Sequence, residues 1–214
     1  MPASLYLPDA SIACNAFGIQ RTVEPTIEPV TVAEAKVSAR VQQSAEDTEW
    51  AEKITAARER CETNTLRALL TQRWRLTLDR FPWGGYRPRI PLFRPPLISV
   101  VSVKYYDTNL VLQTLDPSAY RVLTGKEPGC IEPVAYYWPY TAYYRAENVE
   151  IIYEAGYGTT ADKVPATLRT AIKRLALAWM EEREESEMQE KVQTAFDLLC
   201  VPFKHCFDFG GAFE

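Results

Sequence analysis

The sequence has few of the residues on which enzyme sites most often depend. Its 214 residues include a single histidine, His205, so every site that needs an imidazole base must use it. His205 stands between Cys200 and Cys206 near the end of the chain, where a catalytic base would lack the rigid support and orienting partner that it needs. We therefore expect no Ser-His-Asp or Cys-His nucleophile in this protein.

Metal and cofactor sites are expected to be absent for a similar reason. Zinc needs about four nitrogen or sulfur ligands, which come in pairs at short spacing. Cys200, His205 and Cys206 do not form such pairs, and the other cysteines stand apart in the sequence. The glycine-containing stretch at residues 155–159 is too short for a nucleotide fingerprint, and no lysine follows at the required place. We predict no metal, no cofactor and no enzyme activity.

Excess positive charge, paired cysteines and long apolar runs are also missing. Lys and Arg number 24 against 28 for Asp and Glu, and this net charge of −4 argues against a protein that coats nucleic acid. The cysteines number five and are scattered, which does not fit a secreted disulfide framework, so we expect reduced thiols. No stretch approaches the ~20 apolar residues of a spanning helix, and the first residues lack the basic region of a secretory signal. We expect a soluble protein without a membrane partner.

The sequence does contain a central block of short strands. Residues 74–79, 99–106 and 149–153 alternate apolar and polar side chains, which is typical of half-buried strands. Residues 110–115 are predicted to return as the hairpin partner of 99–106. The side chains predicted to share a face are Trp74, Leu76 and Leu78 in the first strand, Val101, Val103 and Tyr105 in the second, and Val149, Ile151 and Tyr153 in the third.

Helical patterns flank this block at residues 31–65 and 165–200. Thr31, with Glu34 three residues later, fits a capping box at the start of the first helix. Ser44 or Asp47 is expected to cap the next helix, and Pro165 stands where a first-turn proline belongs. Apolar side chains recur at helical spacing in three stripes, which are Trp50, Ile54, Ala57 and Cys61, then Leu168, Ile172, Leu175 and Trp179, and finally Met188, Val192, Phe196 and Leu199.

These patterns predict an α+β fold. We expect a helical bundle body from residues 30–72 and 159–200, with a small antiparallel β-domain inserted at 73–158. Residues 1–29 carry four prolines and no sustained period, so we predict an extended N-terminal arm there. Residues 201–214 are predicted to be an extended C-terminal tail that docks on a partner.

An aromatic cluster at residues 136–144 is the first candidate site. It holds six aromatic side chains in nine residues, and aromatics stack on bases or sugars and are also enriched in protein interfaces. Because Arg145 is the only basic residue nearby, base stacking is the weaker interpretation. Packing within the sheet or against a neighbouring subunit is the stronger one. The alternative function is that of a tail or baseplate protein that binds a host glycan through this loop. The candidate residues are Tyr136, Tyr137, Trp138 and Tyr140.

The C-terminal tail and an acidic run are the other candidates. The tail carries Phe203, Phe207, Phe209 and Phe213 on a glycine-containing segment that cannot build a core of its own. These side chains either dock on another chain or fold back on the protein's own helices. The acidic run consists of Glu181, Glu182, Glu184 and Glu185, whose side chains point in different directions on a helix and therefore do not form an acid–base pair.

The order and spacing of several segments resemble the head–tail connector family of tailed bacteriophages, whose members are also called adaptor or head-completion proteins. The similarity covers about residues 29–200, no single motif in it is diagnostic, and both ends of the chain depart from it. The segments that carry the resemblance are residues 29–36, 57–64, 70–79, 94–107, 113–120, 138–139, 149–158 and 164–172.

The resemblance implies a structural protein of the virion neck, assembled in the host cytoplasm. It implies a ring of twelve copies beneath the portal protein that lengthens the DNA channel and offers a platform to tail, stopper or other neck proteins. Genomic DNA would pass through without sequence-specific binding, since a negatively charged wall lets phosphates slide. We place the acidic run at this wall. The phenylalanine tail is expected to dock on the portal or a neighbouring ring. Lateral contacts between copies are expected to come mainly from the helices at residues 32–65 and 165–200.

Overall fold

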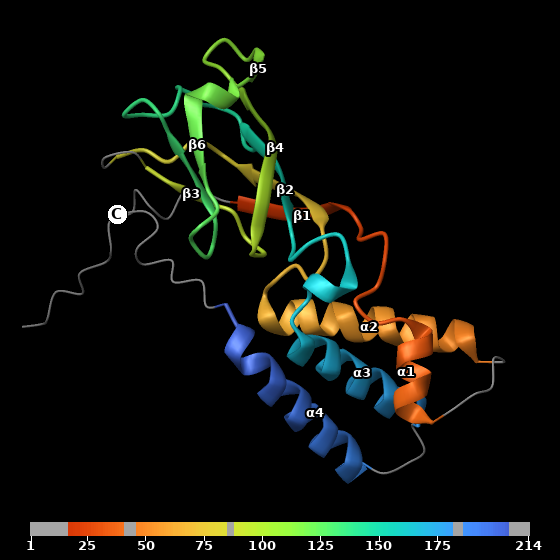
Figure 1. Cartoon of the computed structure of the whole chain (residues 1–214). Helices are drawn as coiled ribbons and strands as arrows, with labels where there is room; N and C mark the ends of the chain where they lie inside the picture. The colour runs from red at the N-terminus through yellow and green to blue at the C-terminus, as the bar shows by residue number, and fades with distance from the viewer. Residues whose placement is uncertain (1–16, 41–45, 85–87, 182–185, 206–214) are drawn as a thin grey trace, which may run out of the picture.

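The computed structural model describes residues 17–40, 46–84, 88–181 and 186–205 of the chain (Figure 1). In these ranges a β part and a layer of helices lie at opposite ends of an elongated molecule. The elements are β1 (Phe17–Val23), α1 (Val32–Ala39), α2 (Asp47–Thr65), β2 (Gln72–Leu78), β3 (Ile90–Pro91), β4 (Leu97–Tyr106), β5 (Leu112–Thr114), β6 (Tyr120–Leu123), β7 (Cys130–Pro133), β8 (Val149–Ala155), α3 (Ala166–Met180) and α4 (Ser186–Cys200), with short 3₁₀ turns η1 (Pro117–Ala119), η2 (Ala161–Lys163) and η3 (Val201–Phe203).

The larger sheet has five strands in the order β1-β2-β8-β4-β5, and all neighbours are antiparallel. In β2 and β8, buried and half-buried residues alternate without a break. Trp74 lies opposite Tyr153 and Leu76 lies opposite Ile151, so both strands present one apolar face. The period-two prediction is confirmed for these two strands. The predicted hairpin return is confirmed as β5.

The prediction for β4 is wrong in part because the strand is irregular. Its pairing with β8 shifts between Leu97 and Ser99 and again between Val100 and Ser102. Each shift adds a residue on one side of the ladder and reverses the faces that follow. As a result Val103 is fully buried, whereas Val101, predicted to share its face, is 47% exposed.

The smaller sheet has three strands in the order β3-β7-β6 and shares its core with the larger one. Ile90, Tyr120 and Ile131 from the small sheet pack in the same apolar cluster as Leu76 and Ile151 from the large sheet. The predicted β region is therefore two antiparallel sheets with a common core.

The predicted N-terminal arm is not irregular throughout. Residues 17–23 form β1, which pairs with β2 along the edge of the five-stranded sheet. In the sequence, only a short alternation of apolar residues marks this strand. In the structure, Ile19 packs against the β core, and pairing with β2 decides the conformation of the segment. Residues 1–16 lie outside the described residues.

The helices begin and end close to where the sequence predicts. Thr31 and Glu34 form the predicted capping box at the start of α1. The predicted cap of α2 is wrong, because Asp47 is already the first helical residue and Glu46 takes the cap position without a side-chain hydrogen bond. Ser44 lies outside the described residues.

A second apolar core joins helices from both ends of the chain. Trp50 and Ile54 of α2 pack with Leu168 and Ile172 of α3 and with Phe196 of α4. The helical stretch predicted at 165–200 is thus two helices that lie against each other. None of the helices that the structure describes is long and apolar enough to cross a bilayer. The fold of the described chain is α+β, with one core in the sheets and one among the helices.

Candidate protein interface and the junction between sheet and helices

The loop between β7 and β8 carries most of the exposed aromatic side chains. Tyr136, Tyr137 and Tyr140 are 60%, 69% and 71% exposed, and Tyr143 and Tyr144 are exposed still further. Residues 133–144 contain no charged side chain at all. An apolar body with a hydroxyl at its tip contacts both apolar and polar groups, and charge depletion is typical of the centre of a protein interface.

A tryptophan from another part of the chain joins this loop. Trp83, which follows β2, is 80% exposed, and its ring centroid lies 6.0 Å from that of Tyr140. We call the set of Trp83, Tyr136, Tyr137, Tyr140, Tyr143 and Tyr144 the aromatic surface.

Trp138 differs from the other three aromatic residues of the predicted site. It is only 7% exposed, and its ring stacks on Phe81 with centroids 4.9 Å apart and planes 5° apart. Its indole N–H donates a hydrogen bond of 2.7 Å to the carbonyl of Pro88. Trp138 therefore anchors the loop in the β core, and the interface prediction stays a prediction for Tyr136, Tyr137 and Tyr140.

Asn148 holds the other end of the loop. It is buried, and its side-chain nitrogen lies 2.9 Å, 2.8 Å and 2.6 Å from the carbonyl oxygens of Asp79, Ala142 and Arg145. Ala142 also donates its backbone N–H to the carbonyl of Tyr106 at 3.1 Å. The loop is thus pinned at several points, and a pinned loop loses little conformational entropy when a partner binds.

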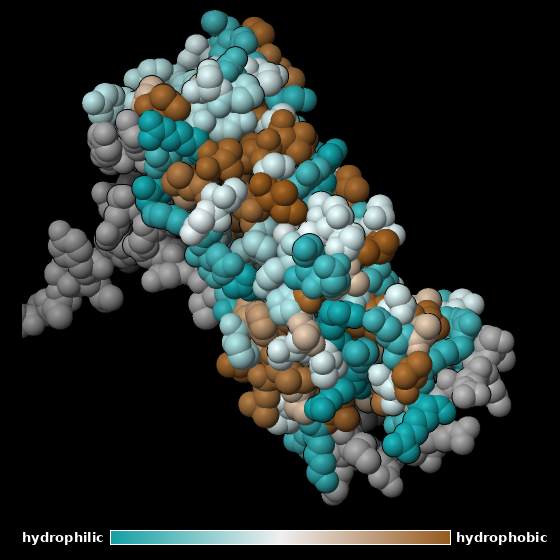
Figure 2. All heavy atoms as spheres, in the orientation of Figure 1, coloured by the Kyte–Doolittle hydropathy of each residue, from teal (hydrophilic) through white to brown (hydrophobic). Residues whose placement is uncertain are grey.

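Exposed aliphatic side chains add to the aromatic ones on the β part. Figure 2 shows apolar residues gathered over β4 and β6 on one face of the molecule. The large aliphatic side chains that are exposed on or beside β4, β5, β6 and β7 are Ile98, Val101, Leu110, Val111, Leu112, Val122 and Val134.

A buried carboxylate lies where the β part meets the helices. Glu62 of α2 accepts hydrogen bonds from Arg58 at 3.1 Å, from Arg21 at 3.4 Å, from the backbone N–H of Leu69 at 3.0 Å and from the side-chain amide of Gln72. Burial raises the pKa of Glu62 and outweighs these contacts, which lower it. Since Arg21 lies on β1 and Gln72 on β2, this one carboxylate joins two strands to α2.

The two arginines extend this junction to further carboxylates. Arg58 pairs with Glu28 at 2.8 Å, and Arg21 pairs with Glu24 at 2.8 Å and Glu59 at 3.3 Å. Arg58 is nearly fully buried, and its attraction to Glu62 and Glu28 raises its pKa against the effect of burial. The junction could have been found from the sequence, because Arg58 and Glu62 are oppositely charged, four residues apart and on the apolar side of α2.

A second contact lies where the chain leaves α4. Arg67 donates from Nε to the carbonyl of Phe203 at 2.7 Å and from Nη1 to Glu127 at 3.0 Å. The backbone N–H of His205 donates to the carbonyl of Thr65 at 3.0 Å. The Phe203 side chain packs against the helical core, so this one residue of the predicted docking tail lies against its own chain.

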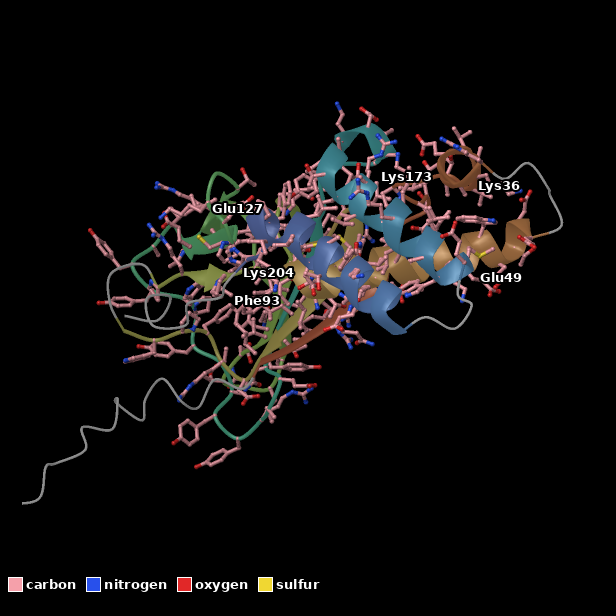
Figure 3. All side chains as sticks on the ribbon, turned by 90° about the horizontal axis from the view of Figure 1, so that it is seen from below. Lys36, Glu49, Phe93, Glu127, Lys173 and Lys204 are labelled. Carbon is pink, nitrogen blue, oxygen red and sulfur yellow. The ribbon has the colours of Figure 1, made fainter. Side chains whose placement is uncertain are left out.

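Figure 3 shows Glu127 and Lys204 at this contact, whereas Lys36, Lys173 and Glu49 lie on the helices away from it. The other predicted tail residues, Phe207, Phe209 and Phe213, lie outside the described residues, as does Cys206.

The acidic run is described at one position. Glu181 is exposed and its backbone N–H donates to the carbonyl of Leu177 at the end of α3, at 3.0 Å. Glu182, Glu184 and Glu185 lie outside the described residues. Among the residues that are described, no three His, Cys, Asp or Glu side chains come together as a metal ion would need.

No protein-family model matches the sequence, and no curated protein sequence matches it. Solved structures do match. One chain from the neck of an empty gene transfer agent (GTA) particle, computed with C6 symmetry, is 21% identical with a TM-score of 0.72, and the match covers 91% of this chain and 99% of that chain. A chain from the virion of the native GTA particle is 21% identical with a TM-score of 0.71, covering 91% and 98%. A chain from the native GTA neck, computed with C12 symmetry, is 19% identical with a TM-score of 0.65, covering 91% and 99%. The chain shares their fold.

Proposed function

We propose that this chain is a structural head–tail connector, or adaptor, in the neck of a tailed phage or phage-like particle. The observation that carries the proposal is the extent of the structural similarity. It spans 91% of this chain and 99% of a chain from a GTA neck, so nearly the whole fold and not one common motif is shared. The order of the sequence segments that resemble phage connectors supports the same function independently.

The connector acts as a ring of identical copies below the portal. Two of the matching necks were computed with C6 and C12 symmetry, and a ring of twelve fits both. Such a ring forms when one face of each copy contacts a different face of the next and the rotation closes. The ring extends the DNA channel and presents an attachment platform to tail or stopper proteins.

The β part supplies much of the surface for these contacts. The sequence predicts lateral contacts through the helices, but the exposed apolar and aromatic side chains lie mainly on the β part. Tyrosine and tryptophan offer large contact areas with few rotatable bonds, and residues of these types often dominate the energy of an interface. The aromatic surface is therefore assigned to a contact with a neighbouring copy or another neck protein.

DNA passes this protein without being gripped. The net charge of −4 supports this role, because holding phosphates tightly would require a surplus of Lys and Arg. Glu181 is exposed at the end of α3, and we place it and the rest of the acidic run at the channel wall.

Removal of the chain from an assembling particle tests the proposal. Hosts that produce particles without this chain should accumulate DNA-filled heads separate from finished tails, and the intact chain supplied in trans should restore joined particles. Electron microscopy of negatively stained lysates counts both forms. Joined, infective particles assembled in the complete absence of the chain would contradict the proposal.

Glycan binding is the second candidate, and the Trp83–Tyr140 pair is the observation that favours it. Two exposed aromatic rings with centroids 6.0 Å apart can hold a sugar face, whereas Trp138 is buried and cannot. Purified protein that binds a glycan array, with binding lost in Trp83→Ala, would support this alternative. Absence of binding on the array would remove it.

A further inference from the structure

Two cysteines from distant parts of the sequence meet inside the helical core. Cys61 lies in α2 and Cys200 is the last residue of α4, 139 residues further along the chain. Their sulfur atoms lie 3.9 Å apart, and neither residue has measurable exposure to solvent. Cys130, a third free thiol, is buried at the start of β7. The paired and the single thiol therefore have comparable burial but different neighbours.

We propose that Cys61 and Cys200 are an oxidisable pair that closes into an intrachain disulfide when the protein meets a peroxide. A disulfide requires sulfur atoms about 2.0 Å apart, so the two sulfurs must approach by roughly 2 Å. Side-chain rotation together with a small shift of the end of α4 supplies such a movement. An isolated buried cysteine is an inert apolar side chain, but contact with a second thiol adds a reaction that Cys130 does not have.

The chemistry needs a peroxide as the oxidant. The Cys200 thiolate attacks one peroxide oxygen, the O–O bond breaks, hydroxide leaves, and Cys200 becomes a sulfenic acid. The Cys61 sulfur then attacks the Cys200 sulfur and gives up its proton, and the hydroxyl group leaves as water. In sum, two thiols and one hydrogen peroxide give one disulfide and two waters, and two electrons pass from the sulfurs to the peroxide.

The two thiols are suited to these different roles. The hydrogen bond between them lowers the pKa of Cys200 and raises the pKa of Cys61. Cys200 is thus the thiol that reaches the thiolate first, and the thiolate is the nucleophilic form. Cys61 keeps its proton until Cys200 has become a sulfenic acid, and then passes it to the departing hydroxyl group as its sulfur attacks Cys200.

The disulfide would hold the end of α4, after which residues 201–214 follow, against α2. Cys200 is followed by η3, where Arg67 binds the Phe203 carbonyl and His205 binds Thr65. A covalent bond to α2 one turn before these contacts holds the end of α4 even when they open. This inference stands on the thiol pair alone and does not depend on the proposed function.

Oxidation of the full chain under controlled conditions tests the inference. A Cys14→Ser, Cys206→Ser background leaves Cys61, Cys130 and Cys200 as the only thiols. After treatment with stoichiometric hydrogen peroxide, the intact mass should fall by about 2 Da, which is the loss of two hydrogens. Alkylation in denaturant should then label Cys130 alone, and peptide mapping should recover the peptides of Cys61 and Cys200 linked. The oxidised protein should melt roughly 10 °C higher than the reduced one, because the closed loop is long.

Matched variants separate this pair from general thiol oxidation. Cys130→Ser should still lose about 2 Da, whereas Cys61→Ser should instead gain oxygen at Cys200. Three alkylatable thiols after oxidation, or a disulfide that involves Cys130, would overturn the inference. Should Cys61→Ser fail to fold, the peptide map of the unmodified pair decides alone, since it requires no substitution at either position.

Discussion

The helical layer and the β part differ in what they present to solvent. The helices bury most of their large apolar side chains against each other, and the exposed ones described there and in η3 are Val37, Leu198 and Val201. The β part has a core of its own and in addition exposes the aromatic surface and several aliphatic residues of β4 to β6. A large exposed patch of this kind marks an interaction site. Both parts thus have a core, but the exposed apolar surface, and with it the proposed contact area, lies mainly on the β part.

The tryptophans show the same contrast at the level of single residues. Trp50 and Trp138 are almost completely buried, one in each core, whereas Trp83 is 80% exposed. Truncating a buried tryptophan should therefore lower stability, whereas truncating the exposed Trp83 should affect only binding.

The largest effect on stability is expected for Trp138→Ala. This change removes the ring that stacks on Phe81 and the hydrogen bond to Pro88, and truncating a buried aromatic residue lowers the free energy of unfolding by about 3–5 kcal/mol. The control, Trp83→Ala, should alter it by less than about 0.5 kcal/mol, because that side chain is exposed. Urea denaturation followed by circular dichroism measures both. Equal effects for the two variants would remove the distinction between anchor and surface.

A comparable loss is expected for Arg58→Ala at the junction. The variant leaves Glu62 buried without its closest cation, and breaking a buried pair in this way costs about 3–5 kcal/mol. Arg60→Ala, an exposed change two residues away on the same helix, is the control and should cost under about 0.5 kcal/mol. Denaturation at low and high salt measures the difference. If Arg58→Ala were as mild as its control, the junction would not bind the two parts together.

A smaller effect, and one that depends on pH, is expected for Glu62→Gln. Because the folded-state pKa of Glu62 is raised by burial, the folded protein holds this proton more tightly than the unfolded chain does. The contribution of Glu62 therefore favours folding at acid pH and is lost as the pH rises through its folded-state pKa. The stability of the natural protein relative to Glu62→Gln should therefore improve on lowering the pH from 7 to 5.

Urea titrations of both proteins across this range give that difference directly. A difference that does not change with pH, or changes in the opposite direction, would show that the cations dominate and that the pKa of Glu62 is not raised.

The smallest effect on stability and a large effect on assembly are expected for Tyr137→Ser with Tyr140→Ser. Both side chains are exposed, so the free energy of unfolding should change by less than about 0.5 kcal/mol. Joining of heads and tails should fall roughly tenfold or more if these residues carry interface energy. Val37→Ser, an exposed apolar change on α1, is the control. Particle counts in complemented lysates provide the measurement. Normal joining by the double variant would contradict the proposal that the aromatic surface contacts a neighbouring chain.

Part of this fold could be predicted from the sequence, because the spacing of apolar residues alone identifies some of the strands and helices. The alternation in β2 and β8 and the stripes of α2 and α3 needed no knowledge of distant residues. The strand β1 was missed, and the buried face of β4 was predicted only in part, because pairing with neighbours, and not local pattern, sets their register. Tertiary context of this kind overrides propensity in strands more often than in helices.

The candidate site was predicted to a similar degree and for similar reasons. The aromatic loop was visible from composition, but its sequence did not distinguish Trp138, the anchor, from the exposed tyrosines beside it. Trp83 joins the surface only through folding, since it is far from the loop in the chain. The junction around Glu62 assembles from β1, α2 and β2, so its members stood in the sequence as separate charges.

Electron cryomicroscopy of the intact particle tests the central claim most directly. We expect a ring of twelve copies of this fold between the portal and the tail, with the tyrosines of the aromatic surface covered by a neighbouring chain. A neck map into which this fold does not fit, or in which the chain is absent, would contradict it.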